Sequence, residues 1–263
     1  MGSRLSINMI NDSNIIYEDE YILVLNKPAG VQVHADEDTK GETVSDWFVA
    51  RCPEAVNVGE LFMSRTGKEM HKPGIVHRLD RETSGVLLLV KDQETFLYIK
   101  ERFKERKVAK TYHAFVYGSV KDDKGVIDRP IGRSSSDFRL RSAQRGARGT
   151  LRPAVTEYAV IKRTPEFSYL ELHPKTGRTH QLRAHLKAIN HPIVCDRLYA
   201  PKHLSAMPVH AGQAEEPALG FARLALHASA LELDIREGVH KRFEAPLPDE
   251  FDMALKLLAS AKY

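Results

Sequence analysis

The sequence contains little cysteine and no long apolar run. Cys52 and Cys195 are the two cysteines among 263 residues. A disulfide framework and a cysteine-based zinc site are therefore disfavoured, and a reducing cytoplasm is the expected location. No apolar stretch approaches the roughly 18 residues that a membrane helix needs. Residues 1–17 lack a basic segment followed by an apolar one, so no secretory signal is expected.

The chain also lacks repeats, low-complexity tracts and Pro/Gly-rich linkers. Its composition, 42% hydrophobic and 28% charged, is typical of a globular protein. A chain of 263 residues is long enough to bury a full core. We therefore predict a single domain over residues 1–263, in which residues 1–14 form an N-terminal extension.

Several common cofactor and metal motifs are missing as well. The sequence has no glycine-rich phosphate loop of the P-loop or dinucleotide type and no His-Glu-x-x-His. Its twelve histidines include His71 with His77 and His180 with His185, and neither pair has the i, i+4 spacing of a helical zinc pair. The sequence thus predicts no metal site and no bound cofactor.

Positive charge is concentrated in two segments, although the net charge is only +4. Residues 100–110 fit a solvated helix face and an RNA-binding face equally well, because Glu101 and Glu105 offer internal ion pairs. Residues 133–152 are rich in Arg, Ser and Gly and contain one acid, Asp137. We predict a mobile loop there that contacts RNA phosphates. Its candidate RNA-binding residues are Arg139, Arg141, Arg145 and Arg148.

Hydrophobic periodicity predicts more strands than helices. A hairpin is expected from residues 15–26 through a turn at residues 27–30 to residues 31–33, and a polar loop over residues 59–74. Thr43, with Asp46 three residues on, predicts a capped helix start. Further strands are expected at residues 86–90, 110–117, 155–161, 169–172 and 224–233, and helices at residues 93–106, 180–190 and 251–259. A mixed, largely antiparallel α+β sheet fits this pattern.

One polar segment stands directly before the apolar run of residues 86–90. It places Asp80 between Arg78 and Arg81, whose guanidinium groups stabilise a negative charge and attract a phosphate-bearing substrate. An isolated Arg-Leu-Asp-Arg would more often be a turn with a local ion pair. Here the run continues as His77-Arg78-Leu79-Asp80-Arg81-Glu82-Thr83-Ser84-Gly85.

This run resembles the catalytic motif of the RluA family of RNA pseudouridine synthases, as a stand-alone catalytic domain without an S4 domain. Further family motifs follow the same order along nearly the whole chain. They are Lys27-Pro28-Ala29-Gly30, Lys110-Thr111-Tyr112-His113-Ala114, Thr176–His185, His191–Val194 with Asp196 and Tyr199, and Leu226-His227-Ala228. Cys195 departs from the pattern, because the family usually has glycine there. The resemblance implies a pseudouridine synthase fold around a catalytic cleft.

The resemblance also implies a role for each matched residue. Asp80 is the catalytic carboxylate, and Tyr112 stacks on a flipped-out uracil. Arg183 forms a salt bridge to Asp80. Arg78, Arg81 and Arg178 contact the RNA, with Arg178 as a phosphate contact or a structural bridge. His77, His180 and His185 are expected to be hydrogen-bonded scaffold residues.

The implied substrate is a structured RNA, either ribosomal or transfer RNA, in which an accessible stem-loop uridine is extruded. No membrane and no obligate protein partner are expected. One alternative is a non-catalytic RNA-binding module with the same fold. A metal-dependent RNA hydrolase is disfavoured by the histidine spacing, and a glycosidase would need a second acid, for which Glu82 is a poor candidate.

Overall fold

The computed structural model describes residues 10–35, 39, 41–63, 66–67, 69–135, 137, 140–201 and 218–260. The chain folds into two compact units, and the expectation of a single domain over residues 1–263 stays a prediction. The first comprises Met1–Ala109 with Ala230–Ala245, and the second Lys110–Ser229 with Pro246–Tyr263. Strand β13 (Leu226–Arg236) has residues in both units.

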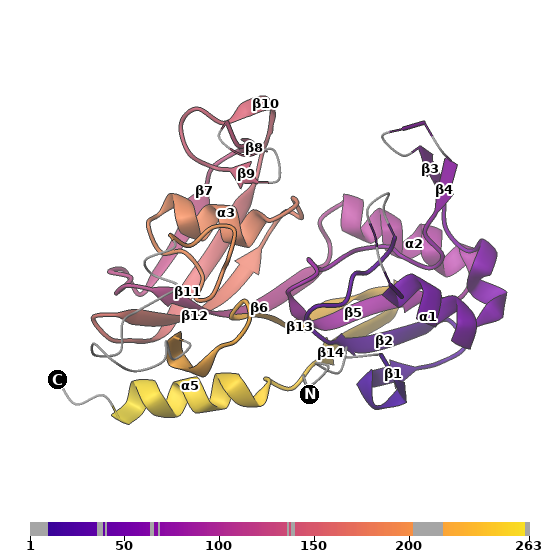
Figure 1. The fold of residues 1–263 in the computed structure, drawn as a ribbon. Coiled ribbons are helices and arrows are strands. Elements are labelled where there is room, and N and C mark those ends of the chain that lie inside the picture. The colour runs from indigo at the N-terminus through magenta and orange to yellow at the C-terminus, as the bar shows by residue number, and fades with distance from the viewer. Residues whose placement is uncertain are drawn as a thin grey trace, which may run out of the picture. The chain divides into compact units, whose positions relative to one another are not determined.

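The first unit contains a sheet with the strand order β1–β2–β5–β13, and β14 pairs with β13 (Figure 1). Every residue of β5 is buried, as an uninterrupted apolar run predicts for a strand covered on both faces. β3 and β4 form a separate hairpin that projects from the rest of this unit (Figure 1). Besides β13, the strands are β1 (Ile15–Glu18), β2 (Ile22–Lys27), β3 (Leu61–Met63), β4 (Glu69–His71), β5 (Ser84–Val90) and β14 (Val239–Glu244).

A capping box fixes where the first α-helix of this unit begins. Thr43 Oγ1 accepts a hydrogen bond from the Asp46 N–H at 3.3 Å, and Asp46 Oδ2 accepts one from the Thr43 N–H at 2.9 Å. This capping box confirms the predicted helix start. The helices are α1 (Val44–Arg51), α2 (Gln93–Lys104) and the 3-10 helices η1 (Asp12–Asn14) and η2 (Pro53–Asn57).

The second unit contains a sheet with the order β13–β6–β12–β11–β7. The ring centroids of Phe115 on β6 and Phe251 on α5 are 5.5 Å apart, and both rings contact Phe221. These contacts tie α5 to the core of the sheet. The elements are β6 (Ala109–Tyr117), β7 (Lys124–Asp128), β11 (Val155–Arg163), β12 (Phe167–Pro174), α3 (Gln181–Ala188), η3 (Ala218–Gly220) and α5 (Asp249–Ser260).

A small sheet occupies much of the segment for which the sequence predicts a loop. β8 (Ile131–Arg133) pairs with both β9 (Arg141–Ser142) and β10 (Arg148–Arg152). Ile131 and the neighbouring Ala143 and Ala154 are buried in a small cluster with Tyr199. The strands are thus anchored by a few small apolar residues, too few to produce a periodic sequence signal. Arg139 lies outside the described residues.

Two local predictions are wrong. Residues 31–33 form no strand, and the hairpin is instead made by β1 and β2 around Asp19. Asp19 Oδ1 accepts hydrogen bonds from the backbone N–H groups of Tyr21 and Ile22 at 2.9 and 2.8 Å, which closes this turn. Residues 59–74, predicted to be a loop, contain the β3–β4 hairpin.

The fold class is confirmed as a mixed architecture with a large, mostly antiparallel sheet and flanking helices. In the part of the chain that the structure describes, no helix is long and apolar enough to span a bilayer.

Candidate active site

Asp80 lies in a short loop that leads into β5. Leu79 beside it is buried at 4% exposure, whereas Asp80 is half-buried. The Asp80 carbonyl accepts a hydrogen bond from the Thr83 N–H at 3.1 Å. Gly74 opens the segment with φ of 66°, and a Cβ there would come within 2.5 Å of both Phe48 and Val90. The close packing around Gly74 and the burial of Leu79 therefore fix the position of the Asp80 backbone, which leaves its side chain half-buried.

Lys27 braces this loop from the neighbouring strand. Its side chain is fully buried, and Nζ donates to the carbonyl oxygens of Pro28 at 2.8 Å, Val31 at 2.9 Å and Arg81 at 3.1 Å. The Arg81 carbonyl also accepts from the Gly30 N–H at 2.8 Å. A buried ammonium is tolerated where several acceptors surround it. Lys27 thus joins the Lys27–Gly30 turn to the residue that follows Asp80.

The charged and aromatic neighbours of Asp80 have separate roles. Arg78 is exposed, and its Nη1 lies 3.2 Å from His34 Nε2. The exposed Arg81 side chain donates from Nε to the Gly30 carbonyl at 3.0 Å. His77 Nε2 accepts from the Leu88 N–H at 2.9 Å, and its ring stacks on Phe103. His77 is therefore a scaffold residue, as predicted.

Tyr112 lies on β6 in the second unit. It pairs in register with Leu172 of β12 and is half-buried against the core. Lys110, two residues earlier on the same face of the strand, donates from Nζ to the Thr176 carbonyl at 3.3 Å. Burial lowers the pKa of Lys110 to about 8.

Arg183 is held rigidly on α3. Its Nε and Nη2 donate to the two carboxylate oxygens of Asp196, each at 2.7 Å, and both side chains are almost fully buried. Asp196 also accepts from the backbone N–H groups of Leu198 and Tyr199. The guanidinium carbon lies 4.9 Å from the Tyr199 ring centroid. Such a bidentate pair orients the guanidinium plane.

The loop before α3 is organised by Gln181, which is buried. Its Oε1 accepts from Thr176 Oγ1 at 2.7 Å and from the Arg178 N–H at 3.0 Å. Arg178 Nε donates to the Pro153 carbonyl at 3.2 Å, so Arg178 bridges to the strand end after β10. The sequence offered no signal for Gln181 beyond its place in the motif.

The other two predicted scaffold histidines are also hydrogen-bonded. His185 is fully buried between Thr156 Oγ1 at 3.0 Å and the Arg129 carbonyl at 2.9 Å, and burial lowers its pKa. His180 Nδ1 lies 2.9 Å from the Tyr199 hydroxyl. Among the described residues, no group of three or more His, Cys, Asp or Glu side chains is arranged to hold a metal ion.

Cys195 occupies a position where the backbone has a left-handed φ of 57°. Glycine adopts this conformation without strain, whereas a residue with a side chain adopts it rarely. The turn forms nevertheless, and Cys195 Sγ donates to the Phe221 carbonyl at 3.0 Å. The departure from the motif therefore leaves the turn intact.

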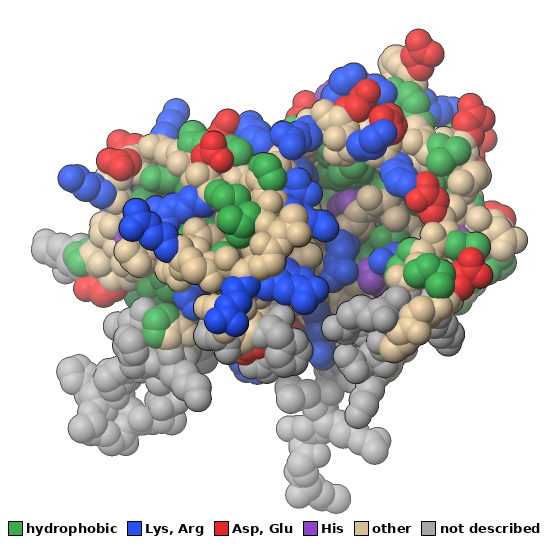
Figure 2. Space-filling view, turned by 90° about the horizontal axis from the view of Figure 1, so that it is seen from above, with side chains coloured by type: hydrophobic (Ala, Val, Ile, Leu, Met, Phe, Trp, Pro, Cys, Tyr) green, Lys and Arg blue, Asp and Glu red, His purple; other side chains and the backbone are tan. Residues whose placement is uncertain are grey.

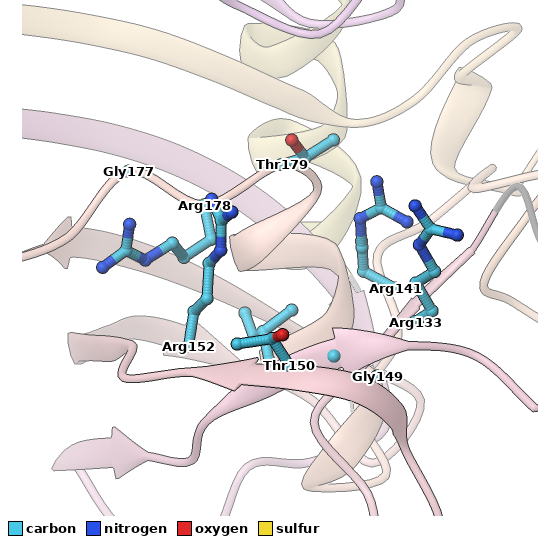
Figure 3. Close-up of a pocket in the computed structure, with 10 residues that line it drawn as sticks. Arg133, Arg141, Gly149, Thr150, Arg152, Gly177, Arg178 and Thr179 are labelled. Atoms are coloured by element: carbon cyan, nitrogen blue, oxygen red, sulfur yellow. The ribbon is translucent and has the colours of Figure 1, made fainter. Parts of the chain in front are cut away.

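Arginines gather around a cavity of about 470 Å³ in the second unit (Figure 3). Arg141 and Arg178, both predicted to bind RNA, line it, whereas Arg145 lines a smaller cavity beside it. Arg148 is exposed on β10. Arg133 and Arg152 also line the larger cavity. The sequence showed them only as part of a basic segment, because pairing in the small sheet is what aligns them.

The structure thus groups the predicted residues by unit. Arg78, Asp80 and Arg81 belong to the first unit, and Tyr112 and Arg183 to the second. The predicted salt bridge between Asp80 and Arg183 stays a prediction.

The sequence matches the family described as RNA pseudouridylate synthase over residues 21–188. It is 34% identical over 245 residues to ribosomal large subunit pseudouridine synthase D of Pseudomonas aeruginosa, covering 93% of this chain and 71% of that protein. Its identity to the enzyme of the same name from Neisseria meningitidis serogroup B is 36% over 247 residues, covering 93% and 61%. The fold is similar to human RNA Pseudouridylate Synthase Domain Containing 4, with a TM-score of 0.69, 26% identity and coverage of 94% and 93%.

Proposed function

The chain belongs to the RNA pseudouridylate synthase family, and from this premise we propose that it isomerises specific uridines in structured RNA, with Asp80 as the catalytic carboxylate. In this reaction the bond between uracil N1 and ribose C1′ breaks, and a bond between uracil C5 and C1′ forms. N1 gains a proton and C5 loses one. Because the reaction is a redox-neutral isomerisation, it needs no oxidant or reductant.

Asp80 takes part in one of two ways. Its carboxylate either bonds to C1′ while N1 departs, or it assists departure through a glycal intermediate. Carboxylates serve as glycosyl nucleophiles in other enzymes, so the first route has chemical precedent. In both routes the freed uracil must rotate before C5 meets C1′, which requires a closed pocket.

Tyr112 and Arg183 complete the proposed machinery. Tyr112 would stack on the extruded base, and such stacking contributes roughly 1–3 kcal/mol per base. Arg183 would pair with the Asp80 carboxylate and keep it anionic. The bidentate ion pair between Arg183 and Asp196 supports this role, because it orients the guanidinium plane before the substrate binds.

The observation that carries the proposal is the way the Asp80 loop is built. A carboxylate that is half-buried lies between two arginines and is braced by the buried Leu79 and by the three acceptors of Lys27. Catalytic groups need such support to hold their geometry. A non-catalytic RNA-binding module would have no need of a braced carboxylate.

We place the substrate uridine in large-subunit ribosomal RNA, because that is the substrate named for the relatives from Pseudomonas and Neisseria. A transfer RNA stem-loop is the second candidate. Extruding a base costs a few kcal/mol and least where it is unpaired, so a loop uridine is the expected target. Both cysteines are free thiols, in keeping with the cytoplasmic location that forms part of this proposal.

The proposal predicts that Asp80→Asn abolishes pseudouridine formation and leaves RNA affinity within about threefold of wild type. Amide and carboxylate have nearly the same shape, but the amide is a poor nucleophile at C1′. The measurement is pseudouridine mapping of total RNA from cells that carry either protein in place of the native gene, with affinity measured by filter binding. Glu82→Gln, which neutralises an exposed carboxylate in the same loop, is the matched control and should retain activity. Pseudouridine formation by Asp80→Asn would refute the assignment, and a wild type that forms none would favour the non-catalytic module.

A further inference from the structure

The β3–β4 hairpin turns a phenylalanine towards the rest of the first unit. Phe62 on β3 lies directly opposite Met70 on β4, so these two side chains share one face of the hairpin. The Phe62 ring meets the His34 ring edge to face, with 6.4 Å between the ring centroids. Lys72 Nζ lies over the Phe62 ring, 3.8 Å from its centroid. An aromatic ring and a positive charge therefore meet on this face of the hairpin.

His34 connects this ring to the loop that contains Asp80. Its Nδ1 lies 3.0 Å from the Ala35 carbonyl oxygen, an acceptor, so Nδ1 carries the proton and Nε2 of the neutral ring is an acceptor. Arg78 Nη1 donates to this Nε2 at 3.2 Å. Arg78 is exposed and precedes Asp80 by two residues. A neutral His34 thus joins the hairpin to the arginine beside the proposed catalytic carboxylate.

Lys72 and Arg78 bring two positive charges to this place without an acidic partner among the described residues. Burial lowers the pKa of Lys72, and the positive charge of Arg78 lowers it further. Cations elsewhere are often paired with acids, as Lys104 is with Glu101. Figure 2 shows this mixture on one face of the molecule, where Asp and Glu side chains lie beside many Lys and Arg side chains. An anion bound by Lys72 and Arg78 would offset their mutual repulsion.

The Phe62 ring is only partly covered. It is half-buried, whereas Phe48 and Phe115 are fully buried in the core. In the part of the chain that the structure describes, His34 and Lys72 are its ring and charge contacts. Part of the ring is therefore accessible to a ligand, and every nucleobase has a flat face that stacks on such a ring.

The hairpin and the Asp80 loop are attached at the same point. The Val58 carbonyl, at the start of the hairpin segment, accepts from the Gly74 N–H at 2.9 Å. Gly74 is the residue that opens the segment leading to Asp80. The Gly59 N–H donates to Gln93 Oε1 on α2 at 2.7 Å, which fixes the base of the hairpin to a helix. The aromatic ring of the hairpin is thus held in a defined place relative to the Asp80 loop.

The opposite face of the hairpin has a different chemistry. Leu61 and Met63 lie there and are 62% and 64% exposed. Glu69 and His71 lie opposite them on β4. Among the described residues of the two strands, this face has an acid and no Lys or Arg. The combination of a ring with unpaired cations therefore belongs to the Phe62 face alone.

The residues that meet on the Phe62 face form one group, which we call the hairpin cluster: His34, Phe62, Lys72 and Arg78. We propose that the hairpin cluster binds the nucleotide next to the target uridine. Its base stacks on Phe62, its phosphate is bound by Lys72 and Arg78, and a purine base is preferred because it offers the larger face for stacking. Of the four residues, only Arg78 is expected from the sequence to contact RNA.

The distance along the chain supports the choice of this nucleotide. Arg78 and Asp80 are two residues apart, and two residues span at most about 7 Å. This length is comparable with the size of one nucleotide. A strand whose uridine is at Asp80 therefore places a neighbouring nucleotide at Arg78. The inference rests on the proposed function, because it names how a second nucleotide of the same substrate is held.

The test measures whether the protein senses the base next to a uridine. One short fluorescein-labelled single strand has a central uridine flanked by adenosines. In a second strand abasic riboses replace these adenosines, so the phosphates stay and only the bases are lost. Affinities are measured by fluorescence anisotropy at one salt concentration. We expect wild type to bind the abasic strand at least about fivefold more weakly, which corresponds to about 1 kcal/mol of stacking.

Phe62→Leu keeps an apolar side chain in the hairpin and removes the flat ring. We expect this variant to bind the two strands with affinities that agree within about twofold, because the stacking contribution is lost. Phe62→Tyr keeps the ring and should discriminate as wild type does. A purely structural role would give another result, since a disordered hairpin would weaken binding of both strands alike. Thermal unfolding of each variant establishes that it is folded.

The matched control is Leu61→Ala, which changes the neighbouring exposed side chain on the opposite face and should keep the wild-type discrimination. A second arm varies the salt concentration. Lys72→Gln should lower the slope of log affinity against log salt by about 0.7, because one phosphate fewer is neutralised. Lys104→Gln, at a lysine that is 73% exposed and paired with Glu101, should keep the slope.

Equal binding of the two strands by wild type would overturn the proposal, as would wild-type discrimination by Phe62→Leu. Loss of discrimination in Leu61→Ala would also overturn it, because the opposite face would then hold the base. Displacement of the labelled strand by oligoglutamate as readily as by unlabelled RNA would assign the cluster to an acidic protein.

The hairpin cluster and the proposed function fail separately. A wild type that forms pseudouridine, with discrimination unchanged in Phe62→Leu, removes only the role of the cluster. Discrimination that depends on Phe62 in a protein without isomerase activity removes only the proposed function.

Discussion

At the residue scale, Lys27 shows how one buried charge can organise a functional loop. Its ammonium joins carbonyl oxygens of Pro28, Val31 and Arg81, which lie on two segments about fifty residues apart. The Lys27–Gly30 motif suggested only a turn. The turn exists because Lys27 holds it, and the same hydrogen bonds hold the residue after Asp80.

Replacing Lys27 with methionine should lower the free energy of unfolding by about 1–3 kcal/mol, because buried carbonyl acceptors lose their donor. Activity should fall more than this loss of folded protein explains, since the Asp80 loop loses its brace. Denaturant unfolding and pseudouridine assays measure the two effects. Lys104→Met, at a position paired with Glu101 but 73% exposed, should change stability by less than about 0.5 kcal/mol. A Lys27→Met protein with wild-type stability and activity would contradict the bracing role.

Lys110 should make stability depend on pH. Its pKa falls from 10.5 in the unfolded chain to about 8 in the fold, because burial disfavours the charged form. Between these values the unfolded state holds the proton and the folded state does not, so stability rises with pH in this window. Since Lys110 is only half-buried, we expect a rise of about 1–2 kcal/mol. Unfolding measured across pH 8–10 should show this increment in wild type and not in Lys110→Met; identical pH profiles would refute the shift.

At the scale of elements, some helices and strands are formed by local sequence signals, whereas others depend on pairing between distant residues. α1 begins where Thr43 and Asp46 form a capping box, and both residues lie within four positions of each other. The apolar run of β5 is enough to predict a buried strand at that position. The small sheet β8–β9–β10, by contrast, depends on pairing across a segment with little apolar content. Its arginines are aligned by that pairing alone.

This alignment predicts that Arg133→Gln stabilises the protein while weakening RNA binding. Removing one of three opposed like charges should raise the free energy of unfolding by about 0.2–1 kcal/mol. Arg152 lies opposite Ile131, so Arg152→Gln should leave stability unchanged and serves as the control. Thermal unfolding without RNA is the measurement. A destabilised Arg133→Gln would mean that the arginine row is structural.

At the scale of the whole molecule, the net charge of +4 conceals an uneven distribution. Arg163 and Arg242 are paired with acidic side chains. Arg133, Arg141, Arg152 and Arg178 line one cavity together, and none of the described residues that line it is Asp or Glu. Asp80 belongs to one unit, and Tyr112 and Arg183 belong to the other.

The sequence by itself determined the family and the fold class, because long motifs and strong apolar periodicity are local signals. Its motifs also led us to propose Asp80, Tyr112 and Arg183 as the catalytic residues, which stays a prediction. It also indicated the histidines at positions 77, 180 and 185 as scaffold residues. Only the tertiary structure decided that Lys27 braces the Asp80 loop, that Asp196 orients Arg183, and that Arg133 and Arg152 join a pocket with Arg178. These contacts link residues far apart in the chain, and their energy depends on burial and strand pairing that no single segment of sequence encodes.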